Sequence, residues 1–378
     1  MKHDFNLTIP QVDFNSNLVQ LIMQLEVLRN QNLVININPR LFTQVKAIFH
    51  MVESLQSARI EGNRTTLSDY VTSKFNEKRE SEDIKEIKNI EKAINYVNLC
   101  YEEKGFKLSA RFLKELHSLI TKDLKTEGSK EGGKFRSCNV TIQNAKHTPP
   151  DMVLVNDYMD KLIKWINQDD RMQMQLLKVA IAHHCFTWIH PFDNGNGRMS
   201  RILTYTMLRQ YGFDMAYLLN STAVFCIDRN KYFEMLQIAD TNTNESSLIW
   251  CEYVLNGINI EMSKVSKLMN KDFFNEKIVK PAINKAYELH FISLEYKQVL
   301  ELALSSPSGL IKSKDIQETL KEKTTRQVTT IINKMVEAEL LQKPETNSRL
   351  YMINLLSKDL ARGIIESLHR EQFISVEE

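Results

Sequence analysis

Apolar residues that recur every three or four positions are the feature that most limits how this chain can fold. In the segment SEDIKEIKNIEKAINYV, Ile84, Ile87, Ile90, Ile94 and Val97 follow this spacing, which places them on one face of an α-helix. Glycine and proline, which interrupt helices, number only 11 and 8 in 378 residues. The chain is therefore expected to be mainly helical, and its length predicts two or three domains.

The longest predicted non-helical segment is EGSKEGGKFRSCNVTIQNAKHTPPDM, residues 127–152. Its glycine pair, the alternating apolar residues Val140 and Ile142, and the Pro149-Pro150 pair predict a short β-hairpin. An isolated hairpin is only marginally stable, so we expect it to lie against a bound peptide or another part of the molecule. Helices are predicted around it, at 15–30, 40–60, 82–103, 108–121, 153–167, 172–188, 197–210, 229–238, 246–268 and 271–288.

The pattern changes after residue 292 to shorter helices at 293–304, 312–320 and 324–341, followed by the ribbon QKPETNSRLYMIN. This order is typical of a winged helix. Residues 311–350 contain eight basic and six acidic residues, a net charge of +2, which supplies few phosphate contacts. DNA binding and a role in packing or dimerisation both remain open for this region.

Charge and cysteine content exclude several classes of protein. The formal net charge of +2 gives no general attraction to nucleic acid or to anionic membranes. The opening MKHDFNLTIPQVDF lacks an apolar signal core, and the apolar run LLKVAIAHHCFTWI is interrupted by Lys178, His183 and His184, so we expect no membrane span and a cytoplasmic protein. The five cysteines are scattered without CxxC pairs, which argues against a disulfide framework and against a zinc site.

Residues 190–201, HPFDNGNGRMSR, combine the residue types of a phosphate-binding loop. Gly195 and Gly197 allow the backbone to approach a ligand, and the predicted helix that follows presents free N–H groups to an anion. Arg198 and Arg201 lie on its first turn and can bind two phosphates. A simple turn would require none of the side chains that accompany the glycines, so the constellation favours nucleotide binding.

This segment resembles the signature of Fic-domain proteins, which transfer AMP from ATP to a hydroxyl of a protein. The flanking segments AHHCFTWIHPF and GKFRSCNVTIQNAKHTPP are also similar to the family, and the resemblance covers roughly 80–260. It implies that His190 is the general base, which suits an imidazole whose ordinary pKa lies near 6.5, and that Phe192 packs inward. The implied nucleotide-binding residues are Gly195, Asn196, Gly197, Arg198 for the β-phosphate and Arg201 for the γ-phosphate. The implied target flap contains Val140, Thr141 and Ile142.

One position departs from the family pattern. The residue before the first glycine is usually Asp or Glu and binds Mg²⁺, whereas this chain has Asn194 there and its acid one place earlier, at Asp193. An amide carbonyl lacks the negative charge that a hard cation prefers. Three alternatives follow: Asn194 binds Mg²⁺ weakly, Asp193 reaches the ion, or the chain catalyses another nucleotide reaction.

A second segment, SARIEGN at 57–63, resembles the family's inhibitory motif. Ser57 and Glu61 are one helical turn apart, and Gly62 would end the helix. The resemblance implies that Glu61 pairs with Arg201 in the γ-phosphate position. Because a hydrogen bond to a charged group contributes about 1.5–3 kcal/mol, its release should raise activity roughly 10–100-fold.

The expected fold is mainly α: a Fic-type helical bundle with a small β-hairpin flap, followed by a winged helix-turn-helix domain. The predicted parts are an inhibitory helical region at 1–80, the catalytic core at 81–270, a connecting helix at 271–291 and the winged helix at 292–378. The expected activity is autoinhibited transfer of AMP from ATP, with Mg²⁺, to a Ser, Thr or Tyr hydroxyl of a target protein or of the chain itself. A nucleotide-sensing DNA-binding regulator and a hydrolase that removes AMP are the alternatives, and a homodimer is a further possible partner state.

Overall fold

The computed structural model describes residues 7–30, 39–75, 81–102, 105–126, 128–129, 131–142, 145–213, 215, 218–345 and 348–373. The chain divides into two compact units. The first contains residues 1–31, 50–65 and 79–263, and the second contains residues 32–49, 66–78 and 264–378. Helix α2 (Pro39–Ile60) begins in the second unit and ends in the first.

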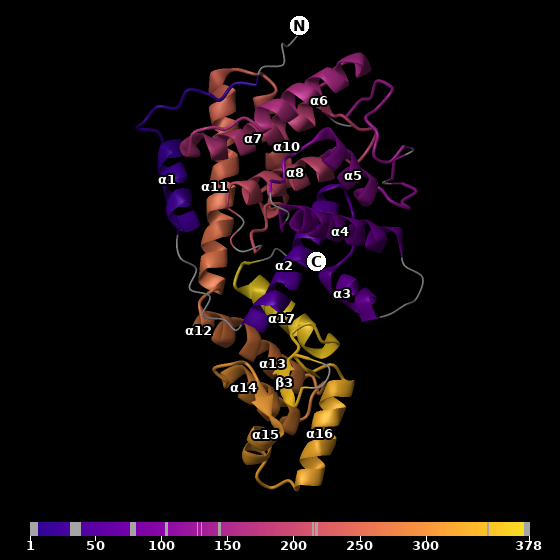
Figure 1. Cartoon of the computed structure of the whole chain (residues 1–378), viewed down its shortest axis with the longest axis vertical. Coiled ribbons are helices and arrows are strands. Elements are labelled where there is room, and N and C mark those ends of the chain that lie inside the picture. Colours follow the sequence, from indigo (N-terminus) through magenta and orange to yellow (C-terminus); the bar gives the residue numbers. More distant parts are fainter. Residues whose placement is uncertain are drawn as a thin grey trace. The chain divides into compact units, whose positions relative to one another are not determined.

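The first unit is built around helix α7 (Met172–Ile189). Apolar residues occupy its whole circumference and most of them are buried, as expected for a helix inside a bundle. It packs against α8 (Asn196–Gln210) and α6 (Met152–Ile166) (Figure 1). The other described helices of this unit are α1 (Asn17–Asn30), the last part of α2, α4 (Glu82–Glu102), α5 (Ala110–Ile120), α9 (Ala223–Cys226), α10 (Arg229–Ala239) and most of α11 (Asn244–Leu268).

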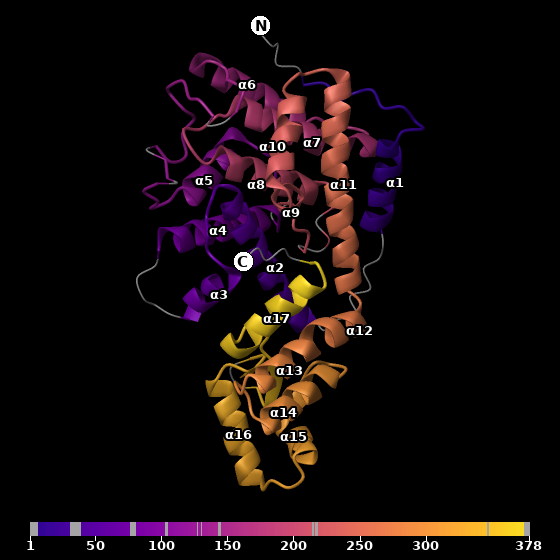
Figure 2. The same ribbon diagram turned by 180° about the vertical axis from the view of Figure 1, so that it is seen from behind.

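Helices α4 and α5 show how local sequence sets the outer layer of this unit. Ser109 caps α5 by accepting a hydrogen bond from the N–H of Phe112. The apolar face of α5 packs against α4, and both helices also contact α8. Figure 2 shows α4, α5 and α8 beside one another from behind. The loop between α7 and α8 is therefore anchored at both ends, because α7 and α8 pack against each other. Helix α5 lies beside α8.

The predicted hairpin is not seen in the part of 127–152 that the structure describes. Among the described residues of 127–152, none is in a β-strand, and the segment runs as turns and extended loop. A two-stranded hairpin needs a ladder of backbone hydrogen bonds or a sheet to pack on. Here the Arg136 side chain holds the segment together instead, because its guanidinium donates to the carbonyl oxygens of Cys138 and Pro150, at 3.0 and 2.5 Å.

The second unit combines helices with a small sheet. Strands β1 (Ile311–Lys312), β2 (Leu341–Gln342) and β3 (Leu350–Ile353) are antiparallel in the order β1-β3-β2. Besides the first part of α2 and the end of α11, its described helices are α3 (Leu67–Phe75), α12 (Lys271–Phe273), α13 (Lys280–Glu288), α14 (Leu294–Ser305), α15 (Ser313–Thr319), α16 (Thr325–Glu337) and α17 (Lys358–Arg370), and a π-helical segment spans Phe274–Val279. From α14 to β3 the elements follow the predicted order, while the winged-helix assignment itself stays a prediction.

Some predicted boundaries were wrong. The helix expected at 271–288 is divided into α12, the π-helical segment and α13, and the one expected at 324–341 ends at Glu337. Helices α3, α9 and α17 were not predicted. None of the five cysteines takes part in a disulfide, and Cys185 and Cys251 are buried. No helix in the described part of the chain is long and apolar enough to cross a bilayer.

Candidate active site

The HPFDNGNGR segment forms the tight connection between α7 and α8. His190 follows the last residue of α7 in the left-handed conformation, with φ 51°, and its N–H donates to the carbonyl oxygen of Phe186. Gly195 precedes α8 and is also left-handed, with φ 73°. Glycine adopts this conformation without steric cost. The two left-handed residues turn the chain so that the first turn of α8 follows directly on the loop.

Phe192 lies beneath this loop, as the resemblance implies. Its side chain is fully buried, and its ring stacks on His117 of α5 with centroids 3.7 Å apart and planes 2° apart. His117 accepts a hydrogen bond from the N–H of Gly133 on Nδ1, so the hydrogen is on Nε2, which donates to the carbonyl oxygen of Asn194 at 3.1 Å. Burial lowers the pKa of His117 to about 4, which keeps this neutral form.

Asn196 closes the loop on itself. Its Oδ1 accepts from the N–H of Phe192 and its Nδ2 donates to the carbonyl oxygen of Phe192, both at 2.9 Å. The side chain is buried and both of its polar atoms are engaged. In this state the amide of Asn196 fixes the loop shape, which differs from the direct phosphate contact that the resemblance implies for it.

His190 is held as a neutral imidazole. Its Nδ1 lies 3.3 Å from the carbonyl oxygen of Thr187, which can only accept, so Nδ1 carries the hydrogen and Nε2 keeps its lone pair. Burial lowers the pKa of His190 to about 4, and the nearby charge of Arg136 acts in the same direction. Arg136 also donates to the carbonyl oxygens of His190, at 2.9 Å, and Ile189, at 3.5 Å, and thereby holds the end of α7.

The predicted inhibitory residues meet Arg201. Three acceptors of α2 and the turn after it surround the guanidinium: Oγ of Ser57 at 2.9 Å from Nε, the carbonyl oxygen of Ser57 at 2.9 Å from Nη2, and Oε1 of Glu61 at 2.7 Å from Nη2. Arg201 is 1% and Glu61 30% exposed. Burial alone would raise the pKa of Glu61, but the charges of Arg201 and Arg198 outweigh it and the pKa is lowered. Gly62, with φ 106°, follows the helix end as predicted.

The Glu61 carboxylate also lies against the first turn of α8. A Cβ added to Gly197 would be 2.2 Å from Oε1 of Glu61 and 3.2 Å from Nη1 of Arg201. Nη1 of Arg201 is buried and has no hydrogen-bond partner among the described residues. An unsatisfied cationic donor beside the N-terminus of a helix is a strong binding position for an anion.

Arg198 is paired away from the loop surface. Its Nη1 lies 2.9 Å from Oε1 of Glu86 on α4, and both side chains are buried. Oε2 of Glu86 accepts a hydrogen bond from Asn63 at 2.9 Å, so this carboxylate joins the SARIEGN segment to the first arginine of the loop. Arg198 lies beside the loop, since its Nη2 is 3.5 Å from a Cβ built on Gly195.

Asp193 and Asn194 do not form a metal site on their own. Asn194 Oδ1 accepts from the N–H of Gly195 and Nδ2 donates to the carbonyl oxygen of Gly128. Oδ1 of the exposed Asp193 accepts from the Ser129 hydroxyl and from the Asn194 N–H. No group of three or more His, Cys, Asp or Glu suited to a metal occurs in the described residues.

Sequence reasoning missed Arg136, His117 and Glu86. Each appears in the sequence as an ordinary loop, helix or surface residue, and only the fold brings it to the loop; a histidine on the apolar face of α5 was the one available signal. Tyr232 is buried, and its hydroxyl is hydrogen bonded to Nε2 of His183 at 2.9 Å. The predicted flap residues Val140, Thr141 and Ile142 are partly or fully exposed.

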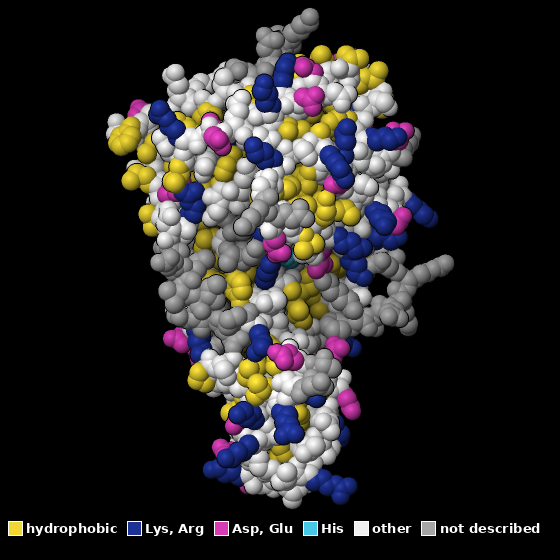
Figure 3. Space-filling view, in the orientation of Figure 1, with side chains coloured by type: hydrophobic (Ala, Val, Ile, Leu, Met, Phe, Trp, Pro, Cys, Tyr) yellow, Lys and Arg dark blue, Asp and Glu magenta, His cyan; other side chains and the backbone are white. Residues whose placement is uncertain are grey.

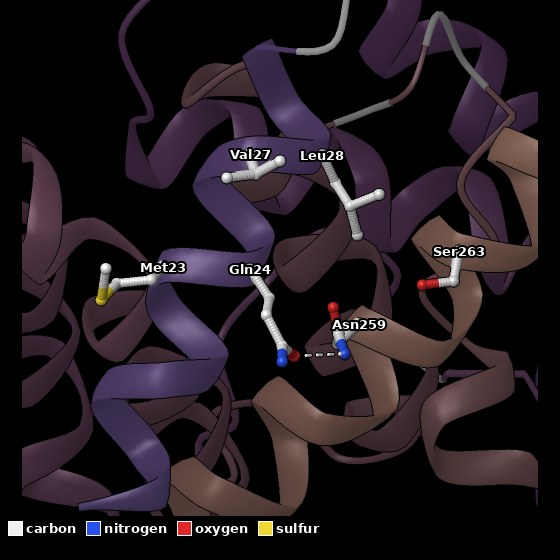
Figure 4. Close-up of a pocket in the computed structure, with 6 residues that line it drawn as sticks. All are labelled: Met23, Gln24, Val27, Leu28, Asn259 and Ser263. Carbon is white, nitrogen blue, oxygen red and sulfur yellow. Dashed lines mark hydrogen bonds between the residues drawn. The ribbon is translucent and has the colours of Figure 1, made fainter. Parts of the chain in front are cut away.

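A separate groove of about 370 Å³ lies between α1 and α11 (Figure 4). It is lined by Met23, Gln24, Val27, Leu28, Asn259 and Ser263, and Gln24 and Asn259 are hydrogen bonded across it at 3.1 Å. None of the predicted site residues belongs to this groove.

Comparisons with known proteins agree with this geometry. Residues 107–208 match the model of the Fic/DOC family. A protein adenylyltransferase Fic of Culex quinquefasciatus is 30% identical over 156 residues, which are 41% of this chain and 29% of that protein. A protein of the same name from Drosophila yakuba is 30% identical over 194 residues, 49% of this chain and 36% of that protein. The chain thus spans about a third of the length of these curated relatives.

Solved structures show the same fold. The crystal structure of a Fic family protein from Desulfovibrio desulfuricans G20 has a TM-score of 0.56 at 20% identity and covers 91% of this chain and 98% of its own. A Fic domain containing signaling protein from Bacteroides thetaiotaomicron has a TM-score of 0.52 at 18% identity, covering 67% and 97%. The chain therefore carries a Fic/DOC family domain over residues 107–208, and proteins named protein adenylyltransferase Fic are among its relatives.

Proposed function

We propose that this chain transfers AMP from ATP to a Ser, Thr or Tyr hydroxyl of a protein, including itself, and that Glu61 inhibits the transfer. The observation that carries the proposal is the position of the Glu61 carboxylate. It binds Arg201 at the start of α8, directly after the HPFDNGNGR loop. An acidic side chain there fills the position in which a phosphate would bind, and the pairing joins the two motifs that the sequence singled out.

The first turn of α8 is the proposed phosphate site. The N-terminus of this helix and the cationic Arg201, with its unsatisfied Nη1, favour an anion. When Glu61 leaves, its place and its hydrogen-bonding partner Arg201 become available to the γ-phosphate. Arg198 then serves the β-phosphate, which requires it to share or exchange its pairing with Glu86. Positioning and charge stabilisation are the main requirements of phosphoryl chemistry.

His190 is the proposed base. The acceptor oxygen forms a bond to the α-phosphorus, the bond from that phosphorus to the oxygen shared with the β-phosphate breaks, and pyrophosphate leaves. The hydroxyl proton passes to Nε2 of His190, whose lone pair is kept by the contact of Nδ1 with Thr187. With its pKa near 4 in the inhibited state, His190 is a weak base, and anionic phosphates beside it would raise its proton affinity.

Mg²⁺ stays a prediction, because the residues at the expected position fit the ion poorly. Both polar atoms of the Asn194 side chain are engaged with backbone groups. Asp193 supplies one exposed carboxylate, which is fewer ligands than a protein-held Mg²⁺ site needs. The steps above therefore depend on the side chains of this chain alone, and the phosphates of ATP would have to supply most ligands of any ion.

The proposed target site is the loop that contains Val140, Thr141 and Ile142. It lies next in the chain to Arg136, which is bonded to the backbone around His190. An extended peptide bound along this loop through main-chain hydrogen bonds would bring its hydroxyl to His190 without a strict sequence requirement. With this arrangement many protein segments could serve as substrate, including segments of the chain itself.

The test uses ATP labelled at the α-phosphate, with a cell lysate as acceptor and denaturing gels as readout. Wild type, Glu61→Gly, Glu61→Gln and Glu61→Gly/His190→Ala are compared. We expect roughly 10–100-fold more label for both single variants, since Glu61→Gly removes the hydrogen bond to Arg201 and Glu61→Gln removes its negative charge, and no label for the double variant. Absence of label with Glu61→Gly, when ATP binding is intact, would refute AMP transfer, and persistence in the double variant would refute His190 as the base.

Removal of AMP was the alternative that the sequence left open for the same pocket. The same set of variants separates it from transfer. Incubation of purified, labelled protein with wild type would release AMP if the Glu61 carboxylate activated water, and Glu61→Gly would abolish the release. Under the proposal made here, Glu61→Gly adds label and wild type releases none.

A further inference from the structure

We propose that the exposed face of α16 and the groove between α14 and α16 bind double-stranded DNA. This inference concerns the second unit only and does not depend on AMP transfer. The groove has a volume of about 500 Å³. It is lined by Ser293, Glu295, Tyr296, Lys323, Thr324, Arg326, Gln327, Thr330, Ile331 and Lys334.

The charges along the groove favour an anionic partner. Lys323, Arg326 and Lys334 are the cations of its lining, and Glu295 is the acid. Glu295 lies 3.1 Å from Lys323, so these two charges largely compensate each other. Arg326 and Lys334 are both exposed and lie two turns apart on α16, about 12 Å along the helix axis for eight residues. Figure 3 shows several Lys and Arg side chains over α15 and α16.

The rest of the exposed face of α16 consists of side chains that can hydrogen bond to base edges. Val328, Ile332 and Met335 are buried and attach the helix to its unit. Gln327, Thr330 and Asn333, together with Arg326, face away from that core and are exposed. Arg is suited to guanine, and Asn and Gln to adenine, in the major groove of DNA.

The length and capping of α16 suit entry into a groove. It has 13 residues, and Thr324 and Gln327 form a complete capping box at its start, so the helix does not need a partner to be stable at that end. It follows α15 after a short turn, which is the arrangement of helix-turn-helix readers. The major groove of B-form DNA admits an α-helix, whereas that of A-form RNA is too narrow. The chemistry therefore points to duplex DNA as the ligand.

The test measures fluorescence anisotropy of a labelled random-sequence DNA duplex between about 50 and 200 mM salt. The full chain carries His190→Ala and no nucleotide is present, so the result is independent of the proposed enzyme activity. Arg326→Ala/Lys334→Ala is compared with Lys358→Ala/Arg362→Ala, a charge-matched pair of exposed cations on α17 of the same unit. Thermal unfolding of both pairs checks that the fold is intact.

We expect the α16 pair to weaken binding at least about tenfold and to reduce the slope of log K against log salt by about 2, because two phosphate contacts are lost. The α17 pair should leave both values unchanged. Three results would overturn the proposal: no salt-dependent binding, an equal loss in the two pairs, or competition by polyglutamate or duplex RNA as effective as competition by DNA. The last would assign the face to an acidic protein or to RNA.

Discussion

The Glu61 carboxylate lies against Gly197, so that a methyl group on Gly197 would stand 2.2 Å from Oε1 of Glu61. Gly197 belongs to the first turn of α8 and does not have a positive φ, so alanine suits its backbone. We expect Gly197→Ala to force Glu61 away from Arg201 and to increase self-labelling with ATP by about tenfold.

A double-mutant cycle separates this clash from a general effect on the loop. In the Glu61→Gly background no carboxylate remains to be displaced, so Gly197→Ala should add nothing to the labelling rate there. An increase of the same size in both backgrounds would show that the methyl group acts on the loop or on the nucleotide and not through Glu61.

Ser57 is the second contact that α2 makes with Arg201. Ser57→Ala removes the acceptor of Nε at 2.9 Å but leaves the Glu61 pair, so inhibition should weaken by about 1–2 kcal/mol, or roughly 5–30-fold in labelling. Ser54→Ala is the matched control, because Ser54 is buried on the same helix and donates to the carbonyl oxygen of His50 within it. Equal effects of the two substitutions would assign the change to α2 stability.

Asn196 distinguishes a loop-closing role from direct phosphate binding. Asn196→Ala removes both hydrogen bonds to Phe192, so the free energy of unfolding should fall by about 1–3 kcal/mol even without nucleotide. Urea unfolding and ATP titration by calorimetry measure the two effects. Loss of ATP affinity with unchanged stability would show that the side chain serves the phosphates alone.

Helices were predictable wherever the apolar spacing is local, and the loop was predictable because its residue types form a dense set. Helix α17 was not predicted from the sequence, because Gly363 lies inside it. A Cβ there would be 2.8 Å from the Cα of Ala282 on α13, so glycine serves a close helix contact that the sequence does not reveal. The hairpin prediction has the converse cause: alternation at Val140 and Ile142 is a local pattern, but a strand needs a pairing partner, and none of the described residues of 127–152 lies in a strand.

The site could be predicted only in part for the same reason. The residues of the loop itself, and Ser57 and Glu61, could be predicted because they belong to motifs with a fixed spacing in the sequence. The supporting groups do not: Arg136, Glu86 and His117 come from three other segments, and their roles depend on packing that brings them within hydrogen-bonding distance. The division of α2 between two compact units is likewise a property of long-range contacts.

The stacked pair His117 and Phe192 makes stability depend on pH. The folded pKa of His117 is about 4, below the unfolded value near 6.5, so the unfolded chain binds more protons between these values and stability falls as the pH falls from 6.5 toward 4. Glu53 acts in the opposite sense, because burial raises its pKa to about 7 and its contribution to stability is lost as the pH rises through that value.

The substitution His117→Gln removes the titration of His117 and leaves Glu53 unchanged. The difference in unfolding free energy between wild type and this variant should shrink by about 2 kcal/mol from pH 7.5 to 4.5, measured by urea unfolding; a difference that is constant with pH would show that His117 does not titrate on unfolding.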